Sequence, residues 1–179
     1  MVSKAELFAL AENEEQELDW EAMFEEQFPR VYNYLRYRTT SDALAEDLAA
    51  ETFARAWRSR KQYRADRAAF STWLFTIGRN LAIDHLRQQR PQVALEDIPE
   101  PAEDEEHLEE MMQNQQNARR LATLLAELPQ RELEIIALRY GADLSHRQIA
   151  RVLRLSSVNV RVTLFRTVRK LRARWERKP

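Results

Sequence analysis

The chain has 179 residues, of which 44% are hydrophobic and 32% are charged, and its formal net charge is −1. This composition is sufficient for one or two modest hydrophobic cores in a soluble protein. Because cysteine is absent, disulfides and cysteine-based zinc sites are excluded. The lack of disulfides fits the reducing cytoplasm. The longest uncharged run, residues 68–78, is 11 residues long and too short to span a membrane, and the acidic N-terminus is unlike a signal peptide. We therefore expect a cytoplasmic chain without membrane insertion.

The small net charge conceals blocks of opposite charge along the chain. Residues 29–90 carry 12 basic and 6 acidic side chains, and residues 129–179 carry 13 and 4. Residues 91–118, between them, carry 9 acidic side chains and no basic one. Basic segments attract nucleic acid, whereas an acidic segment is repelled by it. The pattern predicts two nucleic-acid-facing domains joined by a linker that stays off DNA.

The N-terminal segment, residues 1–19, is acidic and is expected to be mobile. Helical spacing of large apolar residues then begins at Trp20 and continues through Phe24, Phe28, Val31 and Leu35. Pro29 interrupts this spacing, and proline suits the first turn of a helix better than its interior. We therefore expect one short helix ending near Phe28 and another starting at Pro29, with a single kinked helix as the alternative.

Two amphipathic helices are predicted next. Ser41 can cap the first, whose apolar side holds Leu44, Leu48, Phe53 and Ala56. Residues 62–69 mix basic and polar side chains and predict a loop. Helical spacing then resumes over residues 70–89 through six apolar side chains, namely Phe70, Trp73, Leu74, Ile77, Leu81 and Leu86.

Residues 91–118 contain three prolines and nine acidic residues, a composition that cannot bury a core. They predict an extended linker. Two apolar stripes follow, the first of Leu121, Leu124, Leu125 and Leu128, the second of Leu133, Ile136, Ala137 and Tyr140. Pro129 suits a first helical turn, and Gly141 suits the left-handed residue that ends a helix. With the two helices described next, they predict a C-terminal domain of four helices.

Residues 145–175 have the features of a helix-turn-helix. Ser145 and Gln148 have the spacing of a capping box, and Ser156 can cap the second helix, with Leu155 and Val160 placed as a hydrophobic staple. One face of that second helix carries Val160, Leu164, Thr167, Val168, Leu171 and Trp175, and the rest carries Arg161, Val162, Phe165, Arg166, Arg169 and Arg172. Arginines beside exposed apolar groups suit a DNA major groove, and a merely solvated basic helix is the alternative.

Longer stretches of the chain resemble a known family. Two stretches resemble region 2 of the extracytoplasmic-function (ECF) sigma factors of RNA polymerase, namely AEDLAAETFARAWR and FSTWLFTIGRNLAIDHLR. A C-terminal stretch resembles region 4 of the same family, namely LPQRELEIIALRYGADLSHRQIARVLRLSSVNVRVTLFRTVRKLR. The resemblance covers residues 20 to 175 in the family's order. It implies an all-α protein of two small helical domains, residues 20–90 and 119–179, joined by the acidic flexible linker of residues 91–118, with the helix-turn-helix in the second domain.

The resemblance also implies a function for each domain. Region 2 binds the β′ clamp helices of core RNA polymerase and opens the minus-ten promoter element, while region 4 binds the β flap and minus-thirty-five DNA. The linker runs through the polymerase in this family, although its composition fits a solvated spacer equally well. The expected partners are core RNA polymerase, promoter DNA and an anti-sigma factor, which can hold the chain at the membrane.

Site residues follow from the resemblance position by position. The expected polymerase contacts are Asp47, Glu51, Phe53 and Trp57. The expected minus-ten contacts are Tyr63, Arg64, Asp66, Arg67, Phe70, Ser71, Thr72, Arg79 and Asn80. The expected minus-thirty-five contacts are Ser157, Asn159, Arg161, Val162, Phe165, Arg166 and Arg169. Among the aromatic residues of region 2, Phe53, Trp57, Phe70 and Trp73 are equally compatible with a place in the core.

A basic loop beside aromatic residues suits promoter opening, because positive charge follows single-stranded DNA and aromatic faces accept unstacked bases. Some positions depart from the family pattern. Arg154 stands at the usual glycine of the turn, Gly78 replaces a common alanine, and Val158, Asn159 and Thr163 are unusual in the recognition helix. These departures concern promoter preference rather than the fold.

Other functional classes find little support in the sequence. The two glycines, Gly78 and Gly141, make neither a P-loop nor a dinucleotide fingerprint, and the three histidines are scattered. We therefore expect no enzymatic activity, no cofactor and no metal. The remaining alternative is a conventional helix-turn-helix transcriptional regulator, for which residues 145–174 alone would be sufficient. Residues 41–90 favour the sigma factor.

Overall fold

The computed structural model describes residues 19–39, 41–88 and 105–177, which form helices and connecting turns without a strand. Most of the predicted mobile N-terminal segment and residues 91–104 of the predicted linker lie outside these ranges. The helical elements, in chain order, are α2 (Trp20–Arg36), α3 (Asp42–Arg58), η1 (Arg60–Gln62), α4 (Phe70–Gln88), α5 (Glu105–Ala126), α6 (Gln130–Ile136), η2 (Ala137–Gly141), α7 (His146–Leu153) and α8 (Ser157–Glu176).

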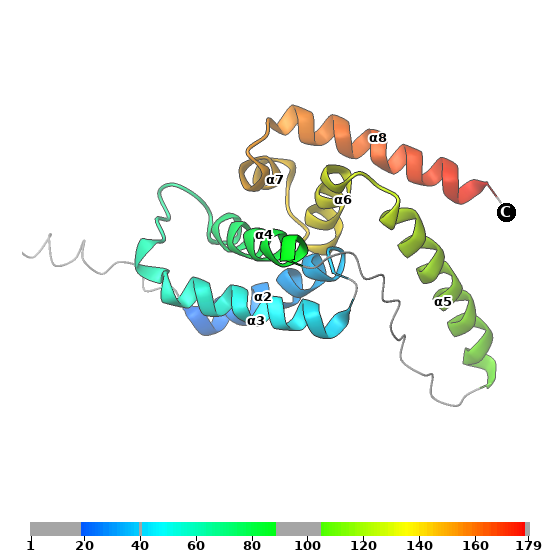
Figure 1. Ribbon diagram of the computed structural model, residues 1–179, viewed down its shortest axis with the longest axis horizontal. Coiled ribbons are helices and arrows are strands. Elements are labelled where there is room, and N and C mark those ends of the chain that lie inside the picture. The colour runs from blue at the N-terminus through cyan, green and yellow to red at the C-terminus, as the bar shows by residue number, and fades with distance from the viewer. Residues whose placement is uncertain (1–18, 40, 89–104, 178–179) are drawn as a thin grey trace, which may run out of the picture.

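Helices α2, α3 and α4 pack together and form the N-terminal half, residues 19–88 (Figure 1). Ser41 caps α3 as predicted, since its hydroxyl accepts a hydrogen bond from the Leu44 amide at 3.3 Å. The apolar faces of the three helices meet in a core that includes Leu35, Ala49 and Phe75. Gly78, where the family commonly has alanine, faces Thr52, whose hydroxyl oxygen would lie 3.2 Å from an added Cβ.

The predicted break at Pro29 is wrong, and the single-helix alternative is correct. Helix α2 runs without interruption from Trp20 to Arg36, with Pro29 inside it. Pro29 has no N–H to donate to the carbonyl oxygen of Glu25, one turn earlier in the helix. Both residues are exposed, so water can hydrogen-bond to that carbonyl instead. Burial of Val31 and Leu35 beyond the proline holds the second half of the helix against the core.

The C-terminal half, residues 105–177, contains the four predicted α-helices, with three differences. Helix α5 begins at Glu105, so the part of the predicted linker from there onward is helical rather than extended. Gly141 does not have a left-handed conformation; Asp143, at φ 48°, takes that role after the π-helical turn η2. Tyr140, which was expected on the apolar stripe, is 57% exposed because the wider turn rotates it outward.

Gly141 has a structural role other than the predicted left-handed helix end: it permits a close approach to α2. A Cβ added there would lie 3.0 Å from the Tyr37 ring, and 3.1 Å from both the Asn33 carbonyl oxygen and the Tyr34 Cα. Two of these three neighbours are backbone atoms of α2 that cannot move aside. Glycine is therefore needed because η2 lies directly against α2, which brings the C-terminal half onto the N-terminal half.

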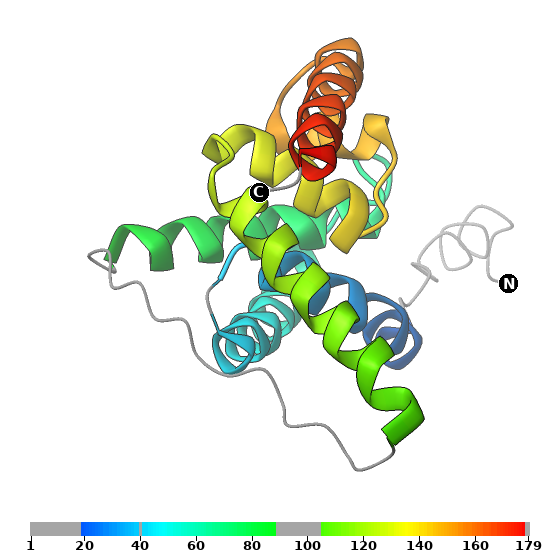
Figure 2. The same ribbon diagram turned by 90° about the vertical axis from the view of Figure 1, so that its right-hand side faces the viewer.

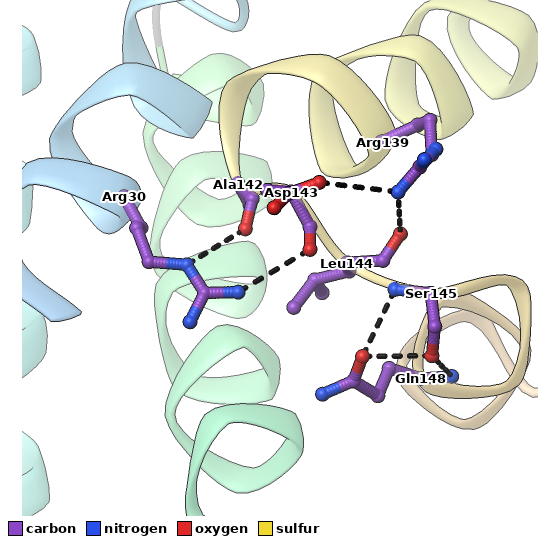
Figure 3. A network of polar contacts seen from close by, with 7 residues as sticks. All are labelled: Arg30, Arg139, Ala142, Asp143, Leu144, Ser145 and Gln148. Atoms are coloured by element: carbon purple, nitrogen blue, oxygen red, sulfur yellow. Dashed lines mark hydrogen bonds and ion pairs between the residues drawn. The ribbon is translucent and has the colours of Figure 1, made fainter. Parts of the chain in front are cut away.

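The helix-turn-helix has the predicted geometry. Ser145 caps α7 in a complete capping box, in which the Ser145 amide donates to Gln148 Oε1 at 2.9 Å and the Gln148 amide donates to Ser145 Oγ at 3.3 Å (Figure 3). Ser156 caps α8 by accepting from the Asn159 amide at 3.1 Å. The turn between them contains Arg154 in the left-handed region, at φ 55° and ψ 48°. The sequence therefore specified both helix starts correctly.

The two halves pack against each other (Figure 2). Their buried apolar side chains belong to one hydrophobic core. Helix α2 contacts η2, and α4 contacts α7. Arg30 of α2 donates from Nε to the Ala142 carbonyl at 2.9 Å and from Nη2 to the Asp143 carbonyl at 3.4 Å (Figure 3). Arg38 donates to Gln130 at 3.0 Å. The sequence predicted two domains but gave no indication of this packing.

The capping box of α7 generates a stability prediction. Ser145→Ala removes the side chain that satisfies an otherwise unpaired amide of a helix only 8 residues long, so it should lower the free energy of unfolding by about 1 kcal/mol. Urea denaturation measures the change. Ser157→Ala is the control, because the exposed Ser157 lies after the cap of α8 and should shift the midpoint little. Equal midpoints for the two variants would show that the cap does not stabilise the fold.

Candidate nucleic-acid interface

The predicted minus-thirty-five residues lie on α8, the second helix of the helix-turn-helix. All of them are exposed, and they comprise Ser157, Asn159, Arg161, Val162, Phe165, Arg166 and Arg169. The opposite face is buried through Val160, Leu164 and Thr167, so the helix cannot rotate to hide its basic side. Large apolar groups are exposed among the arginines, with Phe165 at 68% and Val158 at 59%. Such a mixed surface can contact phosphates, guanine edges and thymine methyls together.

The unusual residues at the start of α8 have local roles. The Asn159 amide nitrogen donates to the capping Ser156, and the Asn159 side-chain oxygen accepts from the Thr163 hydroxyl at 3.1 Å. The Asn159 side chain is therefore oriented along the helix, with its NH2 group left as a donor. Val158 adds exposed apolar surface instead of a polar contact. Sequence comparison with the family could not show this internal bond.

The predicted loop after α3 is ordered by η1 and by aromatic packing. Tyr63 lies 5.1 Å from Trp73 and 5.6 Å from Phe70, measured between ring centroids, and its hydroxyl donates to the Ala68 carbonyl at 3.1 Å. Burial raises the pKa of the Tyr63 phenol above its ordinary value. Phe70 is 7% exposed and belongs to the core, so of the predicted aromatic contacts in this loop Tyr63 is the more accessible.

Charged residues of this loop face solvent. Arg64 pairs with Asp66 at 3.1 Å, and hydrogen bonding from Arg64 holds the pKa of the Asp66 carboxyl below its usual range. Arg67 is exposed beside them. Because both side chains of this ion pair are largely exposed to water, the pair stabilises the loop only weakly, and either side chain can exchange its partner for another.

Asn80 lies at an open cavity on the same half. The cavity has a volume of about 390 Å³ and is lined by Arg55, Arg58, Ser59, Ile77 and Asn80. Asn80 itself is exposed and can offer an amide donor and acceptor to a base edge, next to two guanidinium groups that can balance phosphate charge. The sequence singled out Asn80 but not Arg55 or Arg58, which lie on the preceding helix.

Of the remaining predicted minus-ten residues, Ser71 and Arg79 contact the C-terminal half, and Thr72 is buried between them in sequence on α4. Ser71 and Thr72 are buried, and Ser71 Oγ accepts a hydrogen bond from the Gln148 side chain at 3.1 Å. Arg79 Nε lies 2.8 Å from Glu134 Oε1, and the side chain of Glu134 is only 10% exposed. The structure thus divides the predicted minus-ten site into an accessible part and a covered part.

The predicted polymerase contacts lie on α3. Asp47 is exposed, and Glu51 accepts hydrogen bonds from Arg55 at 2.8 Å and Arg58 at 2.9 Å. The hydrogen bond from Arg55 is the main cause that lowers the pKa of the Glu51 carboxyl. Trp57 is 49% exposed, whereas Phe53 is 7% exposed and packs on Phe24 at 4.8 Å in the core.

Sequence reasoning missed the residues that join the two halves. Glu134 and Gln148 lie far along the chain from Arg79 and Ser71, so no local pattern links them. A weak signal existed for Glu134, which interrupts the apolar run Leu133 to Ala137 and so places a carboxylate next to buried positions. Within the described ranges, no group of three or more histidine, aspartate or glutamate side chains could hold a metal ion, and no helix is long and apolar enough to cross a membrane.

Comparison with known proteins identifies the two regions. The family model of sigma-70 region 2 matches residues 23–92, and that of sigma-70 region 4 matches residues 118–171. The ECF RNA polymerase sigma factor RpoE of Cereibacter sphaeroides is 35% identical over 137 residues, which are 73% of this chain and 74% of that protein. The ECF RNA polymerase sigma factor SigM of Bacillus subtilis is 29% identical over 157 residues, 82% of this chain and 89% of that protein.

Solved structures share the fold. CnrH, in complex with the cytosolic domain of CnrY, matches with a TM-score of 0.66 at 22% identity over 88% of this chain and 87% of that one. The sigma factor RpoE of Bartonella quintana, in complex with the anti-sigma factor NepR, matches with a TM-score of 0.66 at 17% identity over 87% of this chain and 95% of that one. Both regions, in this order and on this fold, show that the chain belongs to the ECF sigma factors and acts as an alternative sigma factor of RNA polymerase.

Proposed function

We propose that this sigma factor reads minus-thirty-five DNA with the exposed face of α8. The observation that carries the proposal is the contrast between the two sides of that helix. One side is buried through Val160 and Leu164, and the other exposes arginine side chains to solvent. A helix held in this way presents guanidinium groups and apolar side chains toward a major groove in a fixed register. Phe165 and Val162 are the proposed contacts for thymine methyl groups, and Arg161 and Arg166 those for guanine edges or phosphates.

We further propose that the loop of residues 63–70 and Asn80 hold the opened minus-ten strand. An unpaired base needs a polar pocket and a neighbouring positive charge. The cavity beside Asn80 has a polar lining that includes Arg55 and Arg58, and because these two side chains share the single carboxylate of Glu51, a net positive charge remains. Ser71, Thr72 and Arg79 belong to the same proposed site. Because Ser71 and Arg79 are bound to side chains of region 4 in this structure, their participation requires these contacts to break.

The proposed polymerase contact is the exposed part of α3, with Asp47, Glu51 and Trp57 on its surface. Arg60 stacks its guanidinium 4.1 Å above the Trp57 ring and keeps this indole in a defined position. Phe53 contributes indirectly, because its burial fixes α3 against α2. We expect an anti-sigma factor as a further partner, since RpoE of Bartonella quintana, which has this fold, was solved in complex with the anti-sigma factor NepR. A membrane-bound anti-sigma factor would hold the chain at the membrane.

Run-off transcription tests the proposal as a whole. Core RNA polymerase with the purified chain should produce discrete transcripts from a few genomic fragments, whereas core polymerase alone should not. A conventional helix-turn-helix regulator would instead bind duplex DNA by itself at paired half-sites and leave the start sites of core polymerase unchanged. Retarded migration of duplex fragments without any new transcript would support that alternative and contradict the proposal.

The α8 proposal predicts different effects for arginines on and off the recognition helix. Arg161→Ala and Arg166→Ala should each weaken promoter binding by the holoenzyme by about 1–3 kcal/mol if the side chain hydrogen-bonds to a guanine edge, and should relax the preference at one base pair. If the side chain contacts only phosphate, the affinity for all promoter sequences should fall alike, and the salt dependence of binding should become less steep. Arg119→Ala, an exposed arginine of α5, is the control. Unchanged affinity in the Arg161/Arg166 double variant would remove this face from DNA binding.

The minus-ten proposal predicts a defect after initial binding. Asn80→Ala should reduce strand opening more than closed-complex formation, because Asn80 would meet bases that are accessible only after melting. Permanganate reactivity of unpaired thymines follows the opening, and a promoter template with a pre-melted minus-ten region should restore transcription. Arg87→Ala, exposed near the end of α4, serves as the matched control. A pre-melted template that restores nothing would contradict this role for Asn80.

The docking proposal predicts a difference between adjacent carboxylates. Asp47→Ala should weaken binding to core polymerase several-fold, because it removes an exposed charge without a partner among the described residues, and alanine preserves the helix. Glu46→Ala, its exposed neighbour, should bind normally. Fluorescence anisotropy with labelled chain and core enzyme measures both affinities, and equal values for the two variants would exclude Asp47 from the interface.

A further inference from the structure

We propose that Arg154, in the turn between α7 and α8, binds a phosphate group of the minus-thirty-five DNA. The inference rests on the function proposed for α8 and deepens it, because it adds a backbone contact to the contacts of the recognition helix. The contact is particular to this chain, since glycine is usual at this position in the family. Three observations carry it, namely the backbone conformation of Arg154, the lack of an internal partner for its side chain, and its place beside α8.

Arg154 occupies a backbone position that favours glycine. Its φ of 55° and ψ of 48° lie in the left-handed region. The amides of Arg154 and Leu155 donate to the carbonyl groups of Arg151 and Ala150 at 3.4 and 2.8 Å, the Schellman arrangement that ends many helices. Glycine is the usual left-handed residue there, because a Cβ strains this conformation. A long side chain at this position therefore works against the fold, and such a strained residue points to a role in function.

The Arg154 side chain has no role in holding the fold together. It is exposed, and it forms no ion pair or side-chain hydrogen bond within residues 19–39, 41–88 and 105–177. The nearest acidic residue before it in the sequence, Asp143, is paired with Arg139 at 3.2 Å. The next acidic residue after it is Glu176, at the far end of α8. The Arg154 guanidinium is therefore available to an external anion.

Positive charge accumulates around this turn. Residues 145–175 contain nine arginine and lysine side chains and no aspartate or glutamate. Arg147 and Arg151 of α7 are exposed and, like Arg154, have no ion-pair partner in the described part of the chain. Like charges four residues apart on a helix repel each other, so an anion that neutralises them is favoured. A DNA backbone, with one negative charge per about 1.7 Å of duplex, is an anion of sufficient charge density.

The position of the turn places Arg154 beside the proposed DNA contact. It directly precedes the end of α8 that would enter the major groove, since Ser156 caps the helix and the proposed contacts begin at Ser157 (Figure 1). In helix-turn-helix proteins the N-terminal residues of the second helix meet base edges. A long cationic side chain at the turn then lies next to the phosphates that border the groove. Such a contact adds affinity without reading the base sequence.

The test compares Arg154→Gly with the unsubstituted chain, both as holoenzyme, on a duplex that carries the minus-thirty-five element and ends before the minus-ten element. Fluorescence anisotropy at several salt concentrations measures the affinity and its salt dependence. Loss of one phosphate contact should weaken binding about five- to tenfold at about 0.1 M salt and lower the slope of log affinity against log salt by about 0.9, with base preference unchanged. Because glycine suits the left-handed backbone, the variant should melt at no lower a temperature than the unsubstituted chain. A loss of binding then cannot come from unfolding.

Two further variants serve as controls. Arg154→Lys keeps the positive charge and should retain the salt slope. Arg119→Ala removes an exposed arginine of α5, away from the turn, and should change neither slope nor affinity. An unchanged slope, an altered base preference or a lower melting temperature in Arg154→Gly would overturn the inference. Weaker binding of that variant to labelled core polymerase, with an unchanged slope on DNA, would also overturn it, because Arg154 would then be a polymerase contact.

The Arg161/Arg166 double alanine variant, measured in parallel, separates failure of this inference from failure of the function proposed for α8. If the double variant loses DNA binding while Arg154→Gly binds with an unchanged slope, the α8 proposal stands and the phosphate contact alone is wrong. If the double variant binds normally, the function proposed for α8 is wrong, and the inference at Arg154 fails with it.

Discussion

The close approach of η2 to α2 is the constraint on which the arrangement of this sigma factor depends. Gly141 permits it, because any side chain at that position would meet the backbone of Asn33 and Tyr34. Once the two backbones are in contact, Arg30 can reach the carbonyl groups that follow η2, and α7 comes to lie on α4. The shared core and the Arg79–Glu134 pair follow from this placement.

The two proposed DNA-binding surfaces consequently differ in accessibility. On α8 the proposed contacts, including Arg161, Arg166 and Phe165, are exposed, whereas Ser71 and Thr72 of the proposed minus-ten site are buried. If Ser71 and Arg79 take part in promoter binding as proposed, polymerase and promoter have to bind more tightly to an arrangement in which the contacts of these residues with Gln148 and Glu134 are broken. A ligand can shift such an equilibrium only through its different affinity for the two states.

Much of the fold could be predicted from local sequence signals. Ser41, Ser145 and Ser156 mark helix starts by hydrogen bonds within a few residues, and apolar spacing identified the buried side of α8. The errors arose where tertiary contacts override local preference. Pro29 lies inside α2 because the residues on both sides of it are packed, and Gly141 serves a distant backbone rather than its own turn. The contact between Arg79 and Glu134 could not be predicted, since these residues are linked only by the folded arrangement.

A cross-link across the halves tests most directly whether opening is required for initiation. Arg30→Cys and Asp143→Cys introduce the chain's only thiols at positions that meet across the contact and that lie outside the proposed DNA and polymerase sites. A cleavable thiol-specific reagent can join them, and singly substituted chains treated alike are the controls. We predict that the joined chain fails to melt the promoter with core polymerase and recovers when the link is cleaved. Normal promoter melting by the joined chain would contradict the requirement for the two halves to separate.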